Sequence, residues 1–136
     1  MGRDKGVVVQ TTTPDTGVLK AEEGSQYKYI QPLAENMGIR VGSNVAYQPI
    51  DSGKDTIAAS VILLKNKQQR GTIDTINADG ESGWLTDKQD QRYPFRQPFL
   101  KELGLAVGSK CRFTLVNDKG TDTAVSLILF VKRSKK

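Results

Sequence analysis

The 136-residue chain contains no histidine, and this absence removes several classes of catalytic site. Histidine is the commonest general acid–base group and the commonest metal ligand, so a histidine-based triad and a histidine–zinc motif are both excluded. The single cysteine, Cys111, excludes an internal disulfide and a multi-cysteine metal framework. No glycine-rich phosphate-binding motif occurs either. The sequence therefore predicts a protein that is not an enzyme and that holds neither a metal nor another cofactor.

Long apolar runs are also missing. Hydrophobic residues make up only 37% of the chain, and no stretch approaches the length of a membrane span. The N-terminus lacks the charged-then-apolar pattern of a secretory signal. We expect a cytoplasmic protein without a membrane partner.

The net charge of +5 is spread unevenly. Residues 1–64 hold six Lys/Arg against seven Asp/Glu, whereas residues 65–136 hold fourteen against eight. Four of the positive charges belong to a basic tail at 132–136, namely Lys132, Arg133, Lys135 and Lys136. Such a tail either keeps the protein in solution or adds non-specific attraction to phosphates.

The chain repeats itself with an offset of 66 residues. The segment "YKYIQPLAENMGIRVGSNVAY" at 27–47 aligns without a gap on "YPFRQPFLKELGLAVGSKCRF" at 93–113. About a quarter of the paired positions between 17–63 and 83–129 are identical, which indicates a tandem duplication.

Each copy has the same order of local signals. Short runs rich in Val, Ile, Thr, Tyr and Phe, separated by polar or glycine-containing turns, predict three strands, then a segment that begins with Pro and ends with Gly, then two more strands. The Pro-to-Gly segments at 32–38 and 98–104 are typical of a helix of one or two turns. The predicted fold is all-β, with two tandem five-stranded OB-type barrels, each with a short helix between strands 3 and 4. The expected divisions are 1–64 for the first barrel, 65–70 for a linker, 71–131 for the second barrel and 132–136 for the tail.

Three motifs of the second copy, in their order and spacing, resemble cold-shock domains. "RGTIDTIN" at 70–77 is similar to the family's opening K-G-x-V-x-W-F-N, and "GWL" at 83–85 falls on its first RNP motif, K-G-F-G-F-I. "LAVGSKCRF" at 105–113 is similar to L-x-x-G-x-x-V-x-F. The resemblance implies OB barrels that bind single-stranded RNA or DNA on a face of aromatic and basic side chains.

The resemblance also implies which residues would form that face. Trp84 takes an aromatic position of the first RNP motif, and its neighbour Leu85 would point into the barrel. "YPFR" at 93–96 lies where the family has its second RNP motif, so Tyr93 and Phe95, two apart on one strand, are placed beside Trp84. Two alternatives stay open: Trp84 fills the core, or Tyr93 and Phe95 form an inward pair. The basic residues expected on this face are Arg70, Lys88, Arg92 and Arg96.

The first copy has lost more of the pattern. Val18 stands where the second copy has Trp84, and the residues left for a binding face are Tyr27, Tyr29, Lys28 and Lys20. The second copy also departs from the family, because Thr75, Ile76 and Ser82 replace aromatic residues. Pro94 cannot donate a ladder hydrogen bond, so its strand should be an edge or bulged there. Cys111 replaces a family valine and is interpreted as a small buried residue.

Two functions follow from this pattern. The first is non-catalytic binding of single-stranded RNA or DNA, mainly through the second barrel. The alternative is a protein-interaction or assembly module that kept the barrel and lost the nucleic acid face, because exposed strand edges readily recruit protein partners.

Overall fold

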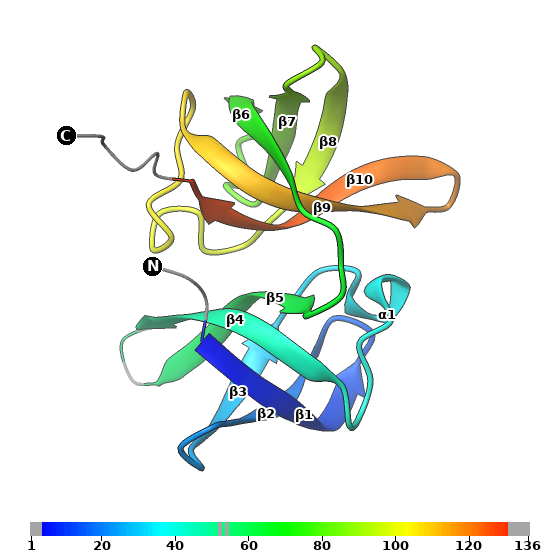
Figure 1. Cartoon of the computed structure of the whole chain (residues 1–136). Helices are drawn as coiled ribbons and strands as arrows, with labels where there is room; N and C mark the ends of the chain where they lie inside the picture. Colours follow the sequence, from blue (N-terminus) through cyan, green and yellow to red (C-terminus); the bar gives the residue numbers. More distant parts are fainter. Residues whose placement is uncertain (1–3, 52, 54, 131–136) are drawn as a thin grey trace, which may run out of the picture.

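The computed structural model describes residues 4–51, 53 and 55–130, and it shows two closed five-stranded β-barrels that follow one another in the chain (Figure 1). The basic tail predicted at 132–136 lies outside the described residues. The first barrel consists of β1 (Asp4–Thr13), β2 (Thr16–Ala21), β3 (Gln26–Ile30), α1 (Ala34–Met37), β4 (Asn44–Asp51) and β5 (Thr56–Leu63). The second consists of β6 (Gln69–Ile76), β7 (Ser82–Asp87), β8 (Arg92–Arg96), β9 (Lys110–Asp118) and β10 (Thr121–Leu129).

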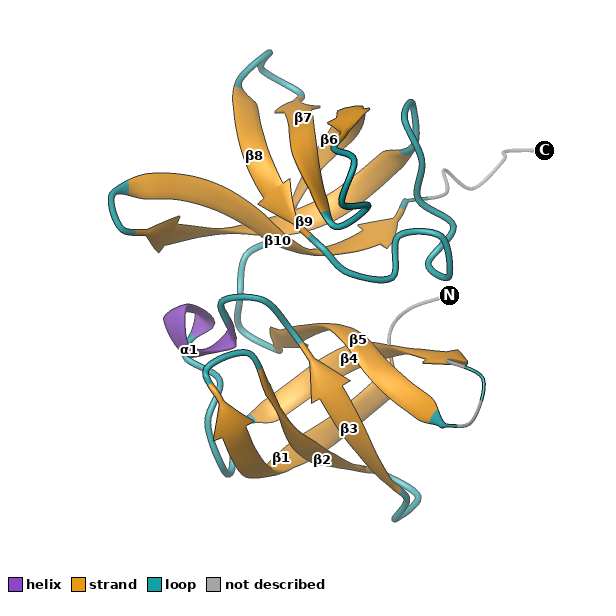
Figure 2. Cartoon of the chain, turned by 180° about the vertical axis from the view of Figure 1, so that it is seen from behind, coloured by secondary structure: helices purple, strands orange, loops and turns teal. Residues whose placement is uncertain are grey.

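Both barrels have the same strand order (Figure 2). The first runs β1-β2-β3-β5-β4 and the second β6-β7-β8-β10-β9, each closed by pairing of its first and fourth strands. The third and fifth strands pair in parallel, as β3 with β5 and β8 with β10, and the other neighbours are antiparallel. Because this circular arrangement is that of an OB barrel, the predicted all-β, two-barrel fold is confirmed.

The backbone repeats the 66-residue offset of the sequence. Leu33 and Phe99 have φ values of 60° and 64°, and Ser60 and Ser126 have φ values of 50° and 58°. Positive φ is uncommon for residues other than glycine, so its recurrence at equivalent positions is strong evidence that the two backbones are alike. The two copies therefore share unusual local conformations as well as their topology.

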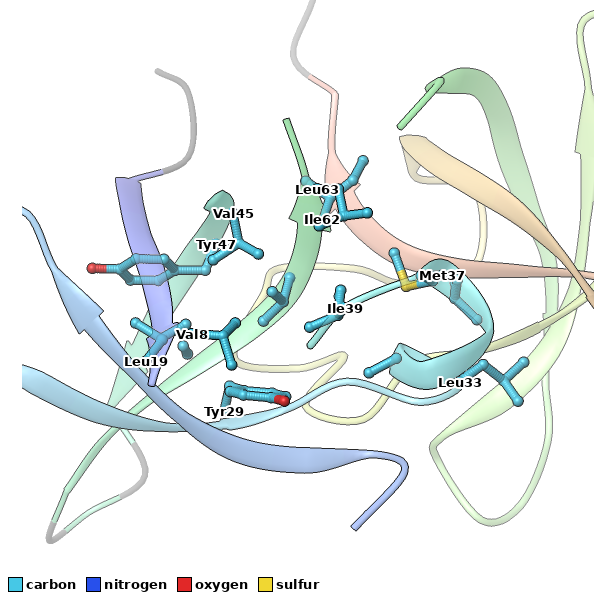
Figure 3. Packing of buried hydrophobic residues seen from close by; sticks show 14 of the residues in the cluster. Val8, Leu19, Tyr29, Leu33, Met37, Ile39, Val45, Tyr47, Ile62 and Leu63 are labelled. Carbon is cyan, nitrogen blue, oxygen red and sulfur yellow. The ribbon is translucent and has the colours of Figure 1, made fainter. Parts of the chain in front are cut away.

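Each barrel is filled by alternate residues of its strands. In the first barrel, Val8, Leu19, Tyr29, Val45 and Tyr47 converge on the interior (Figure 3). In the second barrel, Leu85 and Cys111 point inward, as predicted from the sequence. Burial raises the pKa of the Cys111 thiol to about 12, which disfavours the reactive thiolate.

The segment between the third and fourth strands differs slightly between the copies. In the first barrel it forms α1, which ends at Gly38 with a φ of 91°. In the second barrel the same segment makes one turn, in which the Leu103 N–H donates to the Phe99 carbonyl at 2.9 Å, without becoming a regular helix. Within the described ranges, no helix is long and apolar enough to cross a membrane.

The two barrels pack directly on each other through β5 and β10 (Figure 1). Ile50 and Ala59 of the first barrel belong to the hydrophobic cluster of the second. Their counterparts 66 residues later, Val116 and Val125, belong to the cluster of the first barrel. The buried Ser60 hydroxyl also donates a hydrogen bond to the Leu127 carbonyl. We call this contact the β5–β10 interface; it joins the two cores reciprocally.

The connector between the barrels is short and held in place. β5 ends at Leu63 and β6 begins at Gln69, so the last two residues of the expected 65–70 linker belong to a strand. The Lys67 carbonyl accepts a hydrogen bond from the Thr114 hydroxyl at 3.0 Å, and the Leu63 N–H donates to the Asn66 side chain at 2.9 Å. These bonds fix the connector against both barrels.

Candidate nucleic-acid interface

Trp84 lies on the outer surface of the second barrel. It occupies the middle of β7, between Thr75 of β6 and Pro94 of β8, and is 40% exposed. The Arg92 guanidinium carbon lies 5.1 Å from the centre of the indole ring, within the range of a cation–π contact. An indole displayed in this way can stack against a planar ligand.

The placement of Phe95 beside Trp84 is wrong. Phe95 is only 1% exposed and pairs with Gly83, so its ring crosses the inner face of β7. The corresponding prediction for Tyr29 is wrong for the same reason: it is 1% exposed and its ring covers Gly17. In both copies a glycine leaves the space that this inward ring fills.

The other two tyrosines also turn away from the outer face. Tyr93 pairs with the buried Leu85, and its half-buried ring lies 6.3 Å from that of Phe113. The inward alternative for Tyr93 and Phe95 is therefore the one observed. Tyr27 is half-buried, with its ring 6.1 Å from Tyr47. Trp84 is the only one of the five predicted aromatic residues that remains on the outer surface.

The outward side chains of the second barrel form a row across neighbouring strands. Lys110 of β9 pairs with Thr72 of β6, Thr72 with Thr86 of β7, and Thr86 with Arg92 of β8. Directly opposed residues project from the same side of a sheet, so these four share the outer face. Phe130 extends the row, because its N–H donates to the Lys110 carbonyl at 2.8 Å. We call this row, with Trp84, Arg70, Lys88 and Arg112, the basic face.

One end of the basic face is hollowed into a pocket of about 300 Å³. Its lining consists of Arg70, Gly71, Thr72, Thr86, Asp87, Lys88, Lys110 and Phe130. Arg70 and Arg112 pair across β6 and β9, and their guanidinium carbons lie 4.6 and 5.1 Å from the centre of the Phe130 ring. The pocket thus combines an aromatic ring with several cations.

The charges at the two ends of the face are compensated differently. Arg92 pairs with Asp74 at 3.4 Å, and Arg96 pairs with Asp118 at 3.7 Å. Asp74 also accepts a hydrogen bond from the Thr86 hydroxyl. In the described part of the chain, no carboxylate lies within ion-pairing distance of the cations around Phe130, which are Arg70, Lys88, Lys110 and Arg112.

The acidic residues near this face are held by the backbone. Asp87, in the pocket lining, accepts N–H bonds from Gln89 and Gln91 at 2.8 and 2.9 Å. Asp79, in the turn before β7, accepts from the Glu81 and Ser82 N–H groups, and these bonds lower the pKa of its carboxyl. Asp79 therefore places negative charge near the Trp84 end of the face, in a fixed turn.

The corresponding face of the first barrel has a different chemistry. Val7 occupies the position equivalent to Thr72 and Leu64 the one equivalent to Phe130; they are 39% and 54% exposed. Lys20 and Lys28 are exposed as predicted, but Glu22 takes the position of Lys88. Asn44 and Ala46 replace the cations Lys110 and Arg112. This face carries fewer cations and more apolar surface.

Sequence reasoning missed Lys110, Arg112 and Phe130. Lys110 and Arg112 alternate with the inward Cys111 and Phe113, so their outward direction could have been read from the sequence. Their position beside Arg70 and Thr72 depends on the closure of the barrel by β6 and β9, which no local pattern shows.

Comparison with known proteins adds little to this geometry. No protein-family model and no curated protein match the sequence. Among solved structures, the chain is similar to the crystal structure of a multidomain protein with nucleic acid binding domains from Streptococcus pneumoniae, with 16% sequence identity and a TM-score of 0.34. The match covers 94% of this chain and 45% of the other, so this chain spans less than half the length of that protein. The function is therefore inferred from the residues of this chain.

Proposed function

We propose that the protein binds single-stranded nucleic acid, without catalysis, on the basic face of its second barrel. The single observation that carries the proposal is the exposed Trp84 ring on a face whose other end holds cations with no ion-pair partner among the described residues. Unpaired bases stack on exposed rings for roughly 1–3 kcal/mol each, while Lys and Arg follow the phosphate backbone. A duplex hides its base faces, so the stacking part of the interaction selects a single strand.

Kinship with cold-shock domains is part of the same proposal. It is supported by the order of motifs at 70–77, 83–85 and 105–113 and by the OB strand order of both barrels. The binding surface is not the family's usual aromatic cluster, because Tyr93 and Phe95 face inward. With one displayed ring, contacts between cations and phosphates contribute more to binding than base stacking does. We therefore predict binding that depends strongly on salt concentration and weakly on base sequence.

The test is a fluorescence titration with short single-stranded RNA and DNA. Trp84 is the only tryptophan, so its emission reports on one site. We expect quenching that saturates and that requires more oligonucleotide as salt is raised. Variants without the tryptophan are titrated through the fluorescence anisotropy of a labelled oligonucleotide. Trp84→Ala should weaken binding about 5- to 150-fold with little change in melting temperature, whereas Trp84→Phe should keep part of the affinity. Emission that no oligonucleotide changes, at low or moderate salt, would refute the proposal.

A second candidate function, docking of a protein partner, is favoured by the first barrel. Val7, Val9 and Leu64 are exposed around one groove there, with Lys5 and Lys20 at its edge. Burying apolar surface of this kind gives association that changes little with salt. Pull-down of a partner that survives high salt and is lost in Val9→Lys would favour this function over nucleic acid binding.

A further inference from the structure

We infer that the pocket around Phe130 is a second base-stacking site, which holds one nucleotide of the bound strand at the end of the basic face away from Trp84. The inference rests on the proposed function and extends it to Phe130 and Lys110, which no motif of the sequence indicated. The pocket would take a planar base against the Phe130 ring and the adjoining phosphate against Arg70, Lys88 and Lys110.

The first argument is the chemistry of the lining. Phe130 is half-buried, and two guanidinium groups lie 4.6 and 5.1 Å from its ring centre. Rings and guanidinium planes are the two kinds of surface on which nucleobases stack. A pocket of about 300 Å³ lies at the small end of the range for ligand sites, a size that suits a single nucleotide unit.

The second argument is charge. Arg70, Lys88 and Lys110 line the pocket, and Asp87, its only acidic lining residue, is engaged by the N–H groups of the turn that follows β7. The Arg92 and Arg96 cations near Trp84 already have carboxylate partners, whereas those at the pocket have none among the residues placed by the structure. A phosphate would therefore gain more at the Phe130 end than at the Trp84 end.

The third argument is distance along the face. Phe130 lies beside β9, and Trp84 lies two strands further on, in β7 beyond β6. Neighbouring strands lie about 4.8 Å apart, so the two rings are separated by roughly 15 Å across the sheet. One base cannot contact both rings, whereas a strand of several nucleotides can reach from one to the other.

The first experiment measures the affinity of an eight-nucleotide single strand by Trp84 quenching. Phe130→Leu keeps an apolar side chain but removes the ring, and we expect it to weaken binding about 5- to 150-fold. Phe130→Tyr keeps the ring and should retain the affinity. Leu64→Ala, at the equivalent position of the first barrel, is the matched control and should bind as the unaltered protein does.

A second variant reads the pocket directly. In Trp84→Phe combined with Phe130→Trp, the only tryptophan is at position 130, and its emission should be quenched by the same oligonucleotide. Melting temperatures of all variants show whether they fold. A folded Phe130→Leu variant with unchanged affinity, or a tryptophan at 130 that the oligonucleotide does not quench, would overturn the inference.

The outcomes also separate this inference from the proposed function. Quenching of Trp84 that is unaffected by Phe130→Leu would overturn the second site and leave the proposed function intact. An unresponsive tryptophan at both positions would overturn both. Loss of affinity in Phe130→Leu but not in Phe130→Tyr would support both.

Discussion

Gly83 occupies a point in β7 where no side chain fits. A Cβ added there would lie 2.0 Å from the Thr75 carbonyl oxygen and 2.8 Å from the Phe95 ring. Gly17 is in the same situation, with 2.3 Å to the Gln10 carbonyl oxygen and 2.6 Å to the Tyr29 ring. The glycine allows both the bulge of the neighbouring strand and the inward ring.

Gly83→Ala should therefore destabilise the second barrel by about 1–3 kcal/mol, as expected for overpacking of a well-filled core. The measurement is urea unfolding followed by Trp84 fluorescence. Gln89→Ala, in an exposed turn, is the control and should leave the midpoint unchanged. Equal midpoints for Gly83→Ala and the unaltered protein would contradict the packing described for Phe95.

Buried tyrosine and cysteine side chains make the stability vary with pH in the alkaline range, and the largest pKa shifts are those of Cys111 and Tyr47. Burial raises the pKa of Cys111 from its usual 9.0 to about 12. Burial, together with nearby negative groups such as Asp4, raises the pKa of Tyr47 from 10.0 to about 12. The folded protein then binds more protons than the unfolded chain between about pH 9 and pH 12, so stability falls as pH rises through this range.

The expected result is a melting temperature that drops between pH 8 and pH 10.5. Cys111→Ala should reduce the part of the drop that begins near pH 9, and Tyr47→Phe the part that begins near pH 10. A thermal-melt series of the three proteins measures this. Parallel pH curves for all three would show that neither group contributes.

At the scale of elements, β8 shows how far a sequence pattern can be taken. In the β8 sequence "RYPFR", alternation correctly predicts that Tyr93 and Phe95 share one face. Arg92 and Arg96 lie on the opposite, outer face, so the expectation that they share a binding face with the two rings is wrong. Alternation alone does not say which face is inside. The inward direction of the rings keeps the Arg92 and Arg96 charges out of the core and fills the space above Gly83, and that space is a tertiary feature.

Other features of the fold were predictable for a definite reason. The strand order and the two copies follow from a repeat that carries the same turn signals twice, and Gly38 ends α1 where the Pro-to-Gly segment predicted. The basic face was predicted only in part, because Lys110, Arg112 and Phe130 join it through pairing of β6 with β9 and of the chain after β10 with β9.

The orientation of β7 and β8 can be tested with a pair of substitutions. Phe95→Ala should destabilise the protein by about 3–5 kcal/mol, since it removes a fully buried ring. Trp84→Ala, on the opposite face of the neighbouring strand, should cost far less. Urea unfolding followed by circular dichroism compares the two, because one variant lacks the tryptophan. A larger loss for Trp84→Ala would show that the two faces are assigned in reverse.

At the scale of the whole molecule, the β5–β10 interface joins the two cores, and we expect the two barrels to unfold as one unit. Val116 and Val125 complete the first core, and Ile50 and Ala59 complete the second. A substitution that destabilises one core should therefore also lower the stability of the other barrel.

Leu19→Ala, deep in the first barrel, should lower the stability of the whole chain by about 2–5 kcal/mol. Trp84 fluorescence reports unfolding of the second barrel, and hydrogen exchange reports unfolding of the first. The urea midpoints of both barrels should fall together. Val9→Ala, on the exposed surface of the same barrel, is the control. An unchanged Trp84 midpoint beside a destabilised first barrel would show that the two unfold separately.

The reciprocity of the β5–β10 interface has a consequence for the origin of the chain. Equivalent residues of two copies that enter each other's cores are what a two-fold homodimer displays. The simplest history is an ancestral single barrel that dimerised through its last strand before its gene was duplicated and fused. In a homodimer, one mutation changes the binding faces of both subunits. After fusion, each barrel had its own coding sequence, so the two faces could change independently. One face could then keep its cations and display Trp84, while the other has glutamate, asparagine and alanine in place of Lys88, Lys110 and Arg112.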